Sequence, residues 1–299
     1  YAFTRSLSAY LILKGECDNL GYHHNFIFLP SLRLNYNLKK GGSLSANYQR
    51  RITRPSVDYL NADTLFINNF TRQVGNPNLQ SQHNDSYSLS WRRQIRKAYL
   101  TLTANYEREA DMISQIYITP NNYDVTTYAN IGHSDYAALS ANITQRFCQN
   151  RMNVSLSVTG FHRAYQLDQA YRENTLIQTI KGWGWTGNLN MSYLSTKGWM
   201  YMLSANYRPK SYNLNSTFHR NPNLFLTISK NLFKDRLELE VNFLNSLVYC
   251  WNTRSNTYFR NMHQQTTRRH YANNITISVA WNIGKQFRSR RVASGASND

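Results

Sequence analysis

Several features are absent from this chain of 299 residues, and each absence narrows its possible class. No run of 18 apolar residues occurs, which excludes a transmembrane helix. Neither a glycine loop that would cradle phosphate nor a nucleophile-elbow motif is present. We therefore expect no catalytic residue, no cofactor and no enzymatic activity.

Cysteine is scarce as well. Cys17, Cys148 and Cys250 lie far apart and have no close-paired spacing. A metal site needs clustered ligands, so no metal is expected. One disulfide stays possible, but the sequence does not assign its partners.

Acidic residues are few, with 16 Asp and Glu against 34 Lys and Arg, and the formal net charge is +18. Such a balance first suggests nucleic acid. However, the basic residues fall in turns and at segment ends, as in Lys39-Lys40, Arg92-Arg93 and Arg96-Lys97, and only Arg288–Arg291 forms a basic run. We expect no nucleic acid partner. Charges at strand ends would meet phosphorylated lipid head groups or keep loops solvated.

The sequence is rich in alternation between polar and apolar residues. In Asn274–Ile283 every odd position is apolar and every even one is polar or small. Because successive side chains of a strand point to opposite faces, this pattern predicts a strand with one apolar and one polar face. Glu238 and Glu240 stand on the polar face at mid-strand, so that face should look into water. The mean hydropathy of −0.59 agrees with a polar lumen and polar loops.

About fifteen segments show this pattern, and about 9–11 residues is the length that a tilted strand needs to cross a bilayer. The clearest are 26–38, 43–53, 86–93, 98–109, 135–147, 153–164, 182–194, 199–207, 236–245 and 271–285. Weaker candidates are 1–13, 112–119, 126–131, 171–179 and 224–229. The fold class predicted is therefore all-β, an antiparallel transmembrane β-barrel in the bacterial outer membrane.

Aromatic residues support this interpretation, since the chain holds 22 Tyr, 13 Phe and 6 Trp. Amphipathic rings favour the interface between lipid and water. Tyrosine is also simply a good strand former. The candidates for two aromatic girdles are Trp183, Trp185, Tyr193, Trp199, Tyr207 and Trp281.

Connections between segments alternate between short and long. Short polar turns such as Lys39–Gly42 predict hairpins at one rim. The long connections Arg54–Asp85 and Arg208–Asn223 are expected to face outward and to carry recognition. Candidate substrate-binding residues on these loops are Tyr59, Asn68, Asn69, Arg72, Tyr212, His219 and Arg220.

Four stretches, in order, resemble those of TonB-dependent receptor barrels in the outer-membrane β-barrel family. Arg51–Asn61 resembles R-I-x-R-P-S-Y-x-x-L-N, and Gly75–Gln82 resembles G-N-P-x-L-x-P-E with Ser and Gln at its last two positions. Ser229–Asn245 is similar to K-x-L-F-x-x-K-L … V-N-D-L-F-N, and Val279–Lys285 to a terminal S-Y-x-F-G-K strand. The motif residues singled out are Arg54, Pro55, Ser56, Gly75, Asn76, Pro77, Leu79 and Gly284.

This resemblance implies a barrel of 22 strands with an N-terminal plug domain, and uptake of a nutrient driven by a TonB-type energy-coupling complex. Neither plug nor coupling segment occurs in the sequence, and residue 1 falls inside a strand-like segment. We therefore expect residues 1–287 to be the C-terminal part of such a barrel and residues 288–299 to be a basic, disordered tail. The expected partners are outer-membrane lipid, the plug, the coupling complex and a surface lipoprotein.

Three other hypotheses remain open on the sequence. The first is a passive plugless barrel, either porin-like or a component in assembly or adhesion. The second is a soluble all-β protein that binds nucleic acid or polysaccharide, which would show steep salt dependence. The third is an outer-membrane hydrolase, against which only the missing nucleophile motif speaks.

Overall fold

The chain is built almost entirely of strands in the computed structural model, which describes residues 2–4, 6–20, 23–38, 41–68, 71–118, 124–174, 177–233, 236–245, 251–271, 274–281 and 283. Its helical elements are short: α1 (Val57–Leu60), α2 (Gln169–Asn174) and the 3-10 turn η1 (Cys148–Asn150). Within the described ranges, no helix has the length and apolar character needed to cross a membrane.

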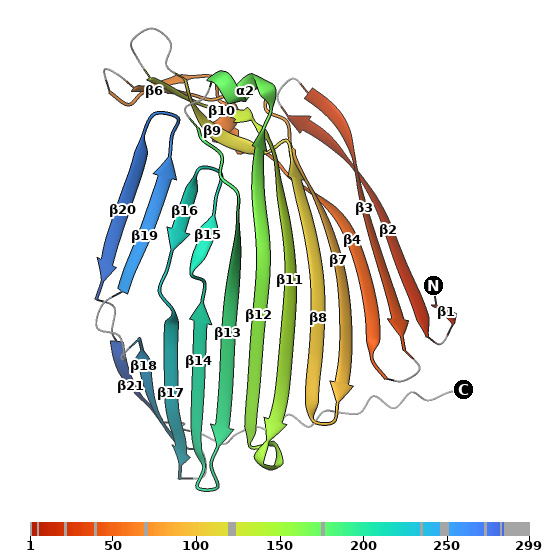
Figure 1. Cartoon of the computed structure of the whole chain (residues 1–299), viewed down its shortest axis with the longest axis vertical. Coiled ribbons are helices and arrows are strands. Elements are labelled where there is room, and N and C mark those ends of the chain that lie inside the picture. Colours follow the sequence, from red (N-terminus) through yellow and green to blue (C-terminus); the bar gives the residue numbers. More distant parts are fainter. Residues whose placement is uncertain are drawn as a thin grey trace.

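Thirteen strands form one curved antiparallel sheet, which we call the wall (Figure 1). In pairing order they are β1 (Ala2–Thr4), β2 (Leu7–Leu20), β3 (His23–Asn37), β4 (Ser43–Thr53), β7 (Gln82–Ile95), β8 (Ala98–Ala110), β11 (Gly132–Phe147), β12 (Met152–Leu167), β13 (Gly182–Leu194), β14 (Trp199–Tyr207), β17 (Asn223–Leu232), β18 (Leu237–Leu244) and β21 (Asn274–Trp281). Each pairs with its sequence neighbour in the wall, so the topology is a meander. This confirms the predicted all-β class.

The two faces of the wall bury polar side chains and expose aliphatic ones, the reverse of a water-soluble sheet. On one face, which we call the apolar face, large aliphatic side chains are exposed, such as Leu89 at 54%, Leu139 at 64% and Ile277 at 72%. On the opposite, polar face, Ser90 and Thr227 are only 6% and 4% exposed. A water-soluble sheet buries its aliphatic side chains instead. The apolar face is therefore suited to lipid.

Hydroxyl and amide side chains of the polar face bond to one another across neighbouring strands. Ser90 Oγ lies 3.0 Å from Thr103 Oγ1, and Ser140 Oγ lies 2.8 Å from Thr159 Oγ1. Thr227 Oγ1 donates to Asn242 Oδ1 at 2.6 Å. These cross-strand bonds explain how small polar residues are satisfied there while aliphatic residues face outward.

The two ends of the wall differ in their connections. At the turn end, short hairpins join β7 to β8, β11 to β12, β13 to β14 and β17 to β18 (Figure 1). Residues with positive φ, including Arg96, Gln149 and Gly198, shape these turns. At the opposite, loop end, long connections follow β4, β8, β12, β14 and β18. The predicted asymmetry between the two rims is present.

The long connections fold into two small sheets at the loop end. One pairs β5 (Thr64–Phe66), β6 (Thr71–Val74), β10 (Asp124–Asn130) and β9 (Ile113–Ile118). The other pairs β15 (Lys210–Tyr212), β16 (Ser216–His219), β19 (Trp251–Tyr258) and β20 (His263–His270). A bridge between Ile177 and Phe259 joins the connection after β12 to the second of these sheets.

The loop end also contains a hydrophobic core of its own. Met112, Ile116 and Ile131 lie 8%, 3% and 0% exposed, together with Ala129, Leu167 and Ile177. Tyr165, Tyr171 and Leu214 pack against them. The loops are thus folded units with fixed positions, which lets them hold side chains in place above the wall.

Three sequence expectations differ from the structure at this end. The strand predicted over 171–179 is wrong, because Asp168 starts the helix α2 by accepting from the backbone N–H groups of Tyr171 and Arg172. The segments 112–119 and 126–131 are strands, but they pair in a small sheet and not in the wall. Strands β19 and β20 were not predicted, because polar and apolar residues hardly alternate in their sequences. The two strands pair with each other through backbone hydrogen bonds.

Candidate ligand-binding site

A row of mostly aromatic side chains crosses the apolar face near the loop end. Tyr48, Tyr87 and Tyr106 stand opposite one another on β4, β7 and β8, and their ring centroids are 4.8 and 6.1 Å apart. The same register continues through Ala137 and His162 to Trp183. Below this row the apolar face carries aliphatic residues.

Charged side chains lie next to the tyrosines on the side of the loop end. Arg50 donates to both carboxylate oxygens of Asp85 at 2.8 Å, and Tyr48 Oη donates to the same carboxylate. Tyr106 Oη donates to Asp135 Oδ1 at 2.7 Å. Rings that point their hydroxyl groups toward charges and their bodies toward aliphatic residues mark the boundary between water and lipid.

The six girdle candidates lie toward the two ends of the wall. Trp183 and Trp185 are at the loop end of β13, and the Trp185 ring meets the ring of Tyr207 edge-on at 5.2 Å. Tyr193 and Trp199 flank the hairpin at the turn end, where Lys230 Nζ lies 4.8 Å from the Trp199 ring. The sixth, Trp281, ends β21 at the turn end. A girdle role for them stays a prediction.

The first long loop is anchored by the residues of the Gly-Asn-Pro motif. Asn76 receives a bond from Asn78 N–H, donates its side-chain amide to the carbonyl of Tyr128 at 2.9 Å, and donates its backbone N–H to the carbonyl of Tyr59. Leu79 is fully buried, at 0% exposed. A Cβ on Gly75 would collide with the carbonyl oxygen of Asn61. The motif thus fixes the path of the loop.

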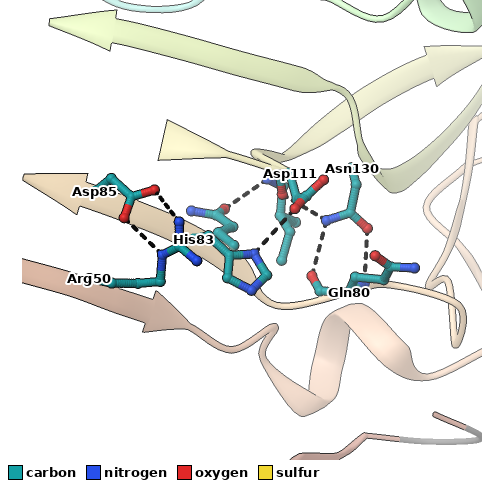
Figure 2. A network of polar contacts seen from close by, with 8 residues as sticks. Arg50, Gln80, His83, Asp85, Asp111 and Asn130 are labelled. Carbon is teal, nitrogen blue, oxygen red and sulfur yellow. Dashed lines mark hydrogen bonds and ion pairs between the residues drawn. The ribbon is translucent and has the colours of Figure 1, made fainter. Parts of the chain in front are cut away.

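A polar network ties the same loop to β7, β8 and β10 (Figure 2). Asn130 accepts from Gln80 N–H at 2.9 Å and donates to the carbonyl oxygens of Gln80 and Asp111. His83 Nδ1 lies 3.2 Å from the carboxylate of Asp111, close to the Arg50 ion pair in the same view. These contacts hold the loop in a single arrangement.

The other motif residues also have structural neighbours. Arg54 Nη2 donates to Glu16 Oε2 at 2.6 Å, which links the first loop to β2. Pro55 is buried, and Ser56 precedes α1 with an extended backbone and no capping bond from its side chain. Pro77 follows Asn76 in the anchored turn. Gly284 lies outside the described residues.

The candidate substrate residues of the first loop lie apart from those of the later loop. Tyr59 stacks on Tyr128 with a centroid separation of 4.0 Å, and Arg72 lies 5.1 Å from the Phe66 ring. Asn68 is exposed beside β6, and Asn69 lies outside the described residues. Tyr59 and Arg72 thus contact aromatic residues of the first small sheet and of the chain beside it.

The candidates of the later loop do converge. Tyr212 and Arg220 line one cavity of about 390 Å³ at the loop end of the polar face. We call it the arginine pocket, defined by Arg163, Arg208, Arg220, Phe161, Tyr212 and Phe218. His219 lies on β16 next to Phe218, opposite Lys210 and Arg254. Its pKa is lowered by burial first, and then by the positive charges of Lys210 and Arg254.

The sequence did not point to Arg163, Arg208 or Phe161. A signal for the pocket was nevertheless present in Gly182-Trp183-Gly184-Trp185, where the tryptophans suggested a girdle. The two glycines alternate with them and therefore lie on the polar face, where Tyr212 and Phe161 occupy the space that a side chain would fill. Glycines that alternate along one face of a strand can thus indicate that aromatic side chains from other strands pack against that face.

The described residues offer no cluster of three His, Cys, Asp or Glu side chains that could bind a metal. Cys17 and Cys148 are free and exposed, and Cys250 falls outside the described part of the chain. Glu107 and Glu109 lie within β8, and Gln82 donates to Glu109 at 2.6 Å. The side chains that line the arginine pocket offer guanidinium groups and aromatic rings to a ligand.

An exposed apolar face, an aromatic boundary and an ordered loop end define the class of protein as an outer-membrane barrel. In agreement, residues 18–281 match the family model of the outer membrane protein beta-barrel family. The chain belongs to this family, and its location is the bacterial outer membrane. The soluble alternative is therefore wrong. A comparison with curated protein sequences gave no match.

Solved structures share the fold at low sequence identity. The siderophore receptor PirA of Pseudomonas aeruginosa aligns with a TM-score of 0.60 and 12% identity over 81% of this chain and 42% of the receptor. PirA of Acinetobacter baumannii gives 0.60 and 14% over 82% and 40%. The FrpB iron transporter of Neisseria meningitidis gives 0.55 and 12% over 86% and 38%. The chain therefore spans well under half the length of these proteins.

Proposed function

We propose that this chain is the barrel portion of a TonB-dependent receptor that takes up a nutrient through the outer membrane. The observation that carries the proposal is the ordered loop end, where two small sheets and a buried core hold a lined cavity above the polar face. A passive pore needs no such cavity. The resemblance of the four motifs and the fold of the siderophore receptors support the same function.

In this function the protein performs binding and gated passage without covalent chemistry. Ligand meets the loops first, and the long connections 54–85 and 208–223 select it. The proposed receptor consists of residues 1–287 as barrel and 288–299 as a basic tail, together with a plug domain. Its other proposed partners are a TonB-type coupling complex and a surface lipoprotein.

Conductance separates this function from the passive barrel. The intact protein would be extracted from outer membranes and reconstituted into planar lipid bilayers. A plugged receptor is expected to give no steady ionic current and to bind the periplasmic domain of TonB saturably. A stable open-channel current without TonB binding would establish the passive barrel and refute the receptor.

A further inference from the structure

As far as the structure describes the chain, the lining of the arginine pocket contains three arginines and no Asp or Glu. Arg163 projects from β12 in the wall, whereas Arg208 and Arg220 flank the small strands β15 and β16. Among the described residues, none of these three guanidinium groups forms an ion pair. Glu107 stands opposite Tyr136, one strand further along the wall, and it too forms no ion pair with Arg163.

The position of Arg163 is fixed by its neighbours. Its guanidinium carbon lies 5.0 Å from the centre of the Tyr136 ring and 5.8 Å from that of Tyr165. Its Nη1 donates to Tyr165 Oη at 3.0 Å, and this hydroxyl donates to the carbonyl oxygen of Tyr212. A half-buried guanidinium held in this way still has free N–H donors, and its geometry suits a carboxylate or phosphate.

Aromatic rings form the other side of the pocket, and the backbone is shaped to receive them. Tyr212 Oη donates to the carbonyl oxygen of Trp183 at 2.9 Å, which docks β15 on the polar face of the wall. A Cβ on Gly182 would collide with the Tyr212 ring, and one on Gly184 would collide with Phe161. Both rings therefore pack directly against glycine backbone, and Phe218 adds a third ring to the lining.

Further positive charge surrounds the pocket. Lys210 Nζ lies 4.8 Å from the centre of the ring of Tyr212, which lines the pocket. Arginines that gather at one cavity and form no ion pair with any described residue attract anions to it. The aromatic rings in the lining add apolar contact area for a ligand with a flat face.

We infer that the arginine pocket binds a small planar organic anion, with a flat ring or conjugated face and at least two carboxylate or phosphate groups. The guanidinium groups bind the oxyanions, and the rings of Phe161, Tyr212 and Phe218 pack on the flat face. This inference rests on the proposed function, because it identifies the pocket as the place where the receptor first holds its ligand.

The test is calorimetric titration of the intact protein in detergent with benzene-1,3,5-tricarboxylate. Three comparison probes each lack one feature of this ligand. Citrate has no ring, inorganic phosphate has no organic part, and benzamide has no charge. Saturable binding of the tricarboxylate at one site is expected, with citrate and phosphate at least about tenfold weaker and benzamide without measurable binding. Equal binding of citrate or phosphate would overturn the planar part of the inference, and equal binding of benzamide would overturn the anionic part.

Variants separate the pocket from general charge. R208Q/R220Q should weaken tricarboxylate binding by about a hundredfold or more, because each arginine contributes charge-assisted bonds. R268Q/R269Q removes the same two positive charges from exposed β20 and should leave the affinity unchanged. Unaltered affinity in R208Q/R220Q, or no binding of any anion by wild-type protein, would refute the site.

The folded state of each variant is checked by the heat-dependent shift in gel mobility that intact barrels show. Because the titration uses neither TonB nor an energised membrane, its outcome is independent of the conductance and TonB assays. Failure of anion binding with TonB binding intact refutes only the pocket, whereas the opposite pattern refutes only the coupled uptake.

Discussion

At the scale of single residues, glycine positions decide how the loop end is built. Gly75, Gly182 and Gly184 each lie where a Cβ would meet a backbone oxygen or an aromatic ring. Gly75 belongs to a motif that can be recognised in the sequence. The structure adds the reason for the glycine, because the carbonyl oxygen of Asn61 occupies the space that a Cβ would need. The motif therefore acts through the path of the chain and not through contact with a ligand.

Gly75→Ala tests this role. The new Cβ should displace the Asn61 segment and destabilise the first loop by about 1–3 kcal/mol. Limited proteolysis in detergent should cut residues 54–81 faster while the wall stays intact. The control is Gly160→Ala on β12, where a Cβ has open space and the loop should keep its wild-type cleavage rate. Equal cleavage of the two variants would contradict the anchoring role.

At the scale of elements, the two faces of each wall strand follow from alternation. On β11, Asn142 lies on the polar face and Ile143 on the apolar face, about midway between the aromatic row and the turn end. The side chain of Ile143 is 40% exposed, as expected for contact with lipid.

Ile143→Lys should therefore cost about 2–4 kcal/mol of folding free energy in a bilayer, because a charge at the midplane is poorly solvated. Asn142→Lys is the matched control and should cost much less, because its side chain faces the polar interior. Denaturant titration of the intact protein in lipid vesicles measures both. A similar loss in the two variants would mean that the faces are assigned incorrectly.

The sheet of β15, β16, β19 and β20 should depend on pH through His219. Its folded-state pKa lies below the unfolded value, so the unfolded chain binds more protons between the two values and stability rises with pH. The stabilisation is complete above about pH 6.5 and falls as the pH drops toward the folded-state pKa. The protection factors for hydrogen exchange of peptides covering 216–219, which correct for the intrinsic pH dependence of exchange, should be lower at pH 5 than at pH 7.

His219→Asn should abolish this pH dependence, since it removes the titrating ring that faces Lys210 and Arg254. The matched variant His263→Asn on β20 should retain it. If the protection factors of His219→Asn keep the wild-type dependence on pH, another group in the sheet controls it.

At the scale of the whole molecule, the wall has two edges among the described residues, β1 and β21. An antiparallel sheet of thirteen strands sends its first and last strands in the same direction, whereas bacterial single-chain barrels close with an even number of strands. Lipid does not tolerate unpaired strand edges. The chain thus needs further strands, from its own polypeptide or from another molecule, to be stable in a membrane.

Refolded alone in detergent, the chain of 299 residues should associate through these edges. Size-exclusion chromatography with light scattering is expected to show species larger than 35.0 kDa of protein. The proposed receptor, which adds a plug and further strands to this chain, is the control in the same detergent and should give one defined species. A monodisperse monomer of the isolated chain would show that the edges close on each other.

The sequence by itself determined the class, the faces of the strands and the division into turns and loops. These properties depend on neighbours one or two positions apart, so alternation and turn residues predict them directly. It also brought Tyr212 and Arg220 into consideration, because both lie on a long polar connection.

Only the tertiary structure decided that the loops form two sheets with a buried core and that β19 and β20 pair, since these contacts join segments without a local pattern. It also brought Arg163 of the wall beside Arg208 and Arg220 of a loop more than forty positions away. Contacts over such distances depend on the register of strands and the docking of loops, which no local pattern specifies. The ligand pocket therefore depends on the tertiary structure, whereas the alternation of polar and apolar residues already predicts the strands of the wall.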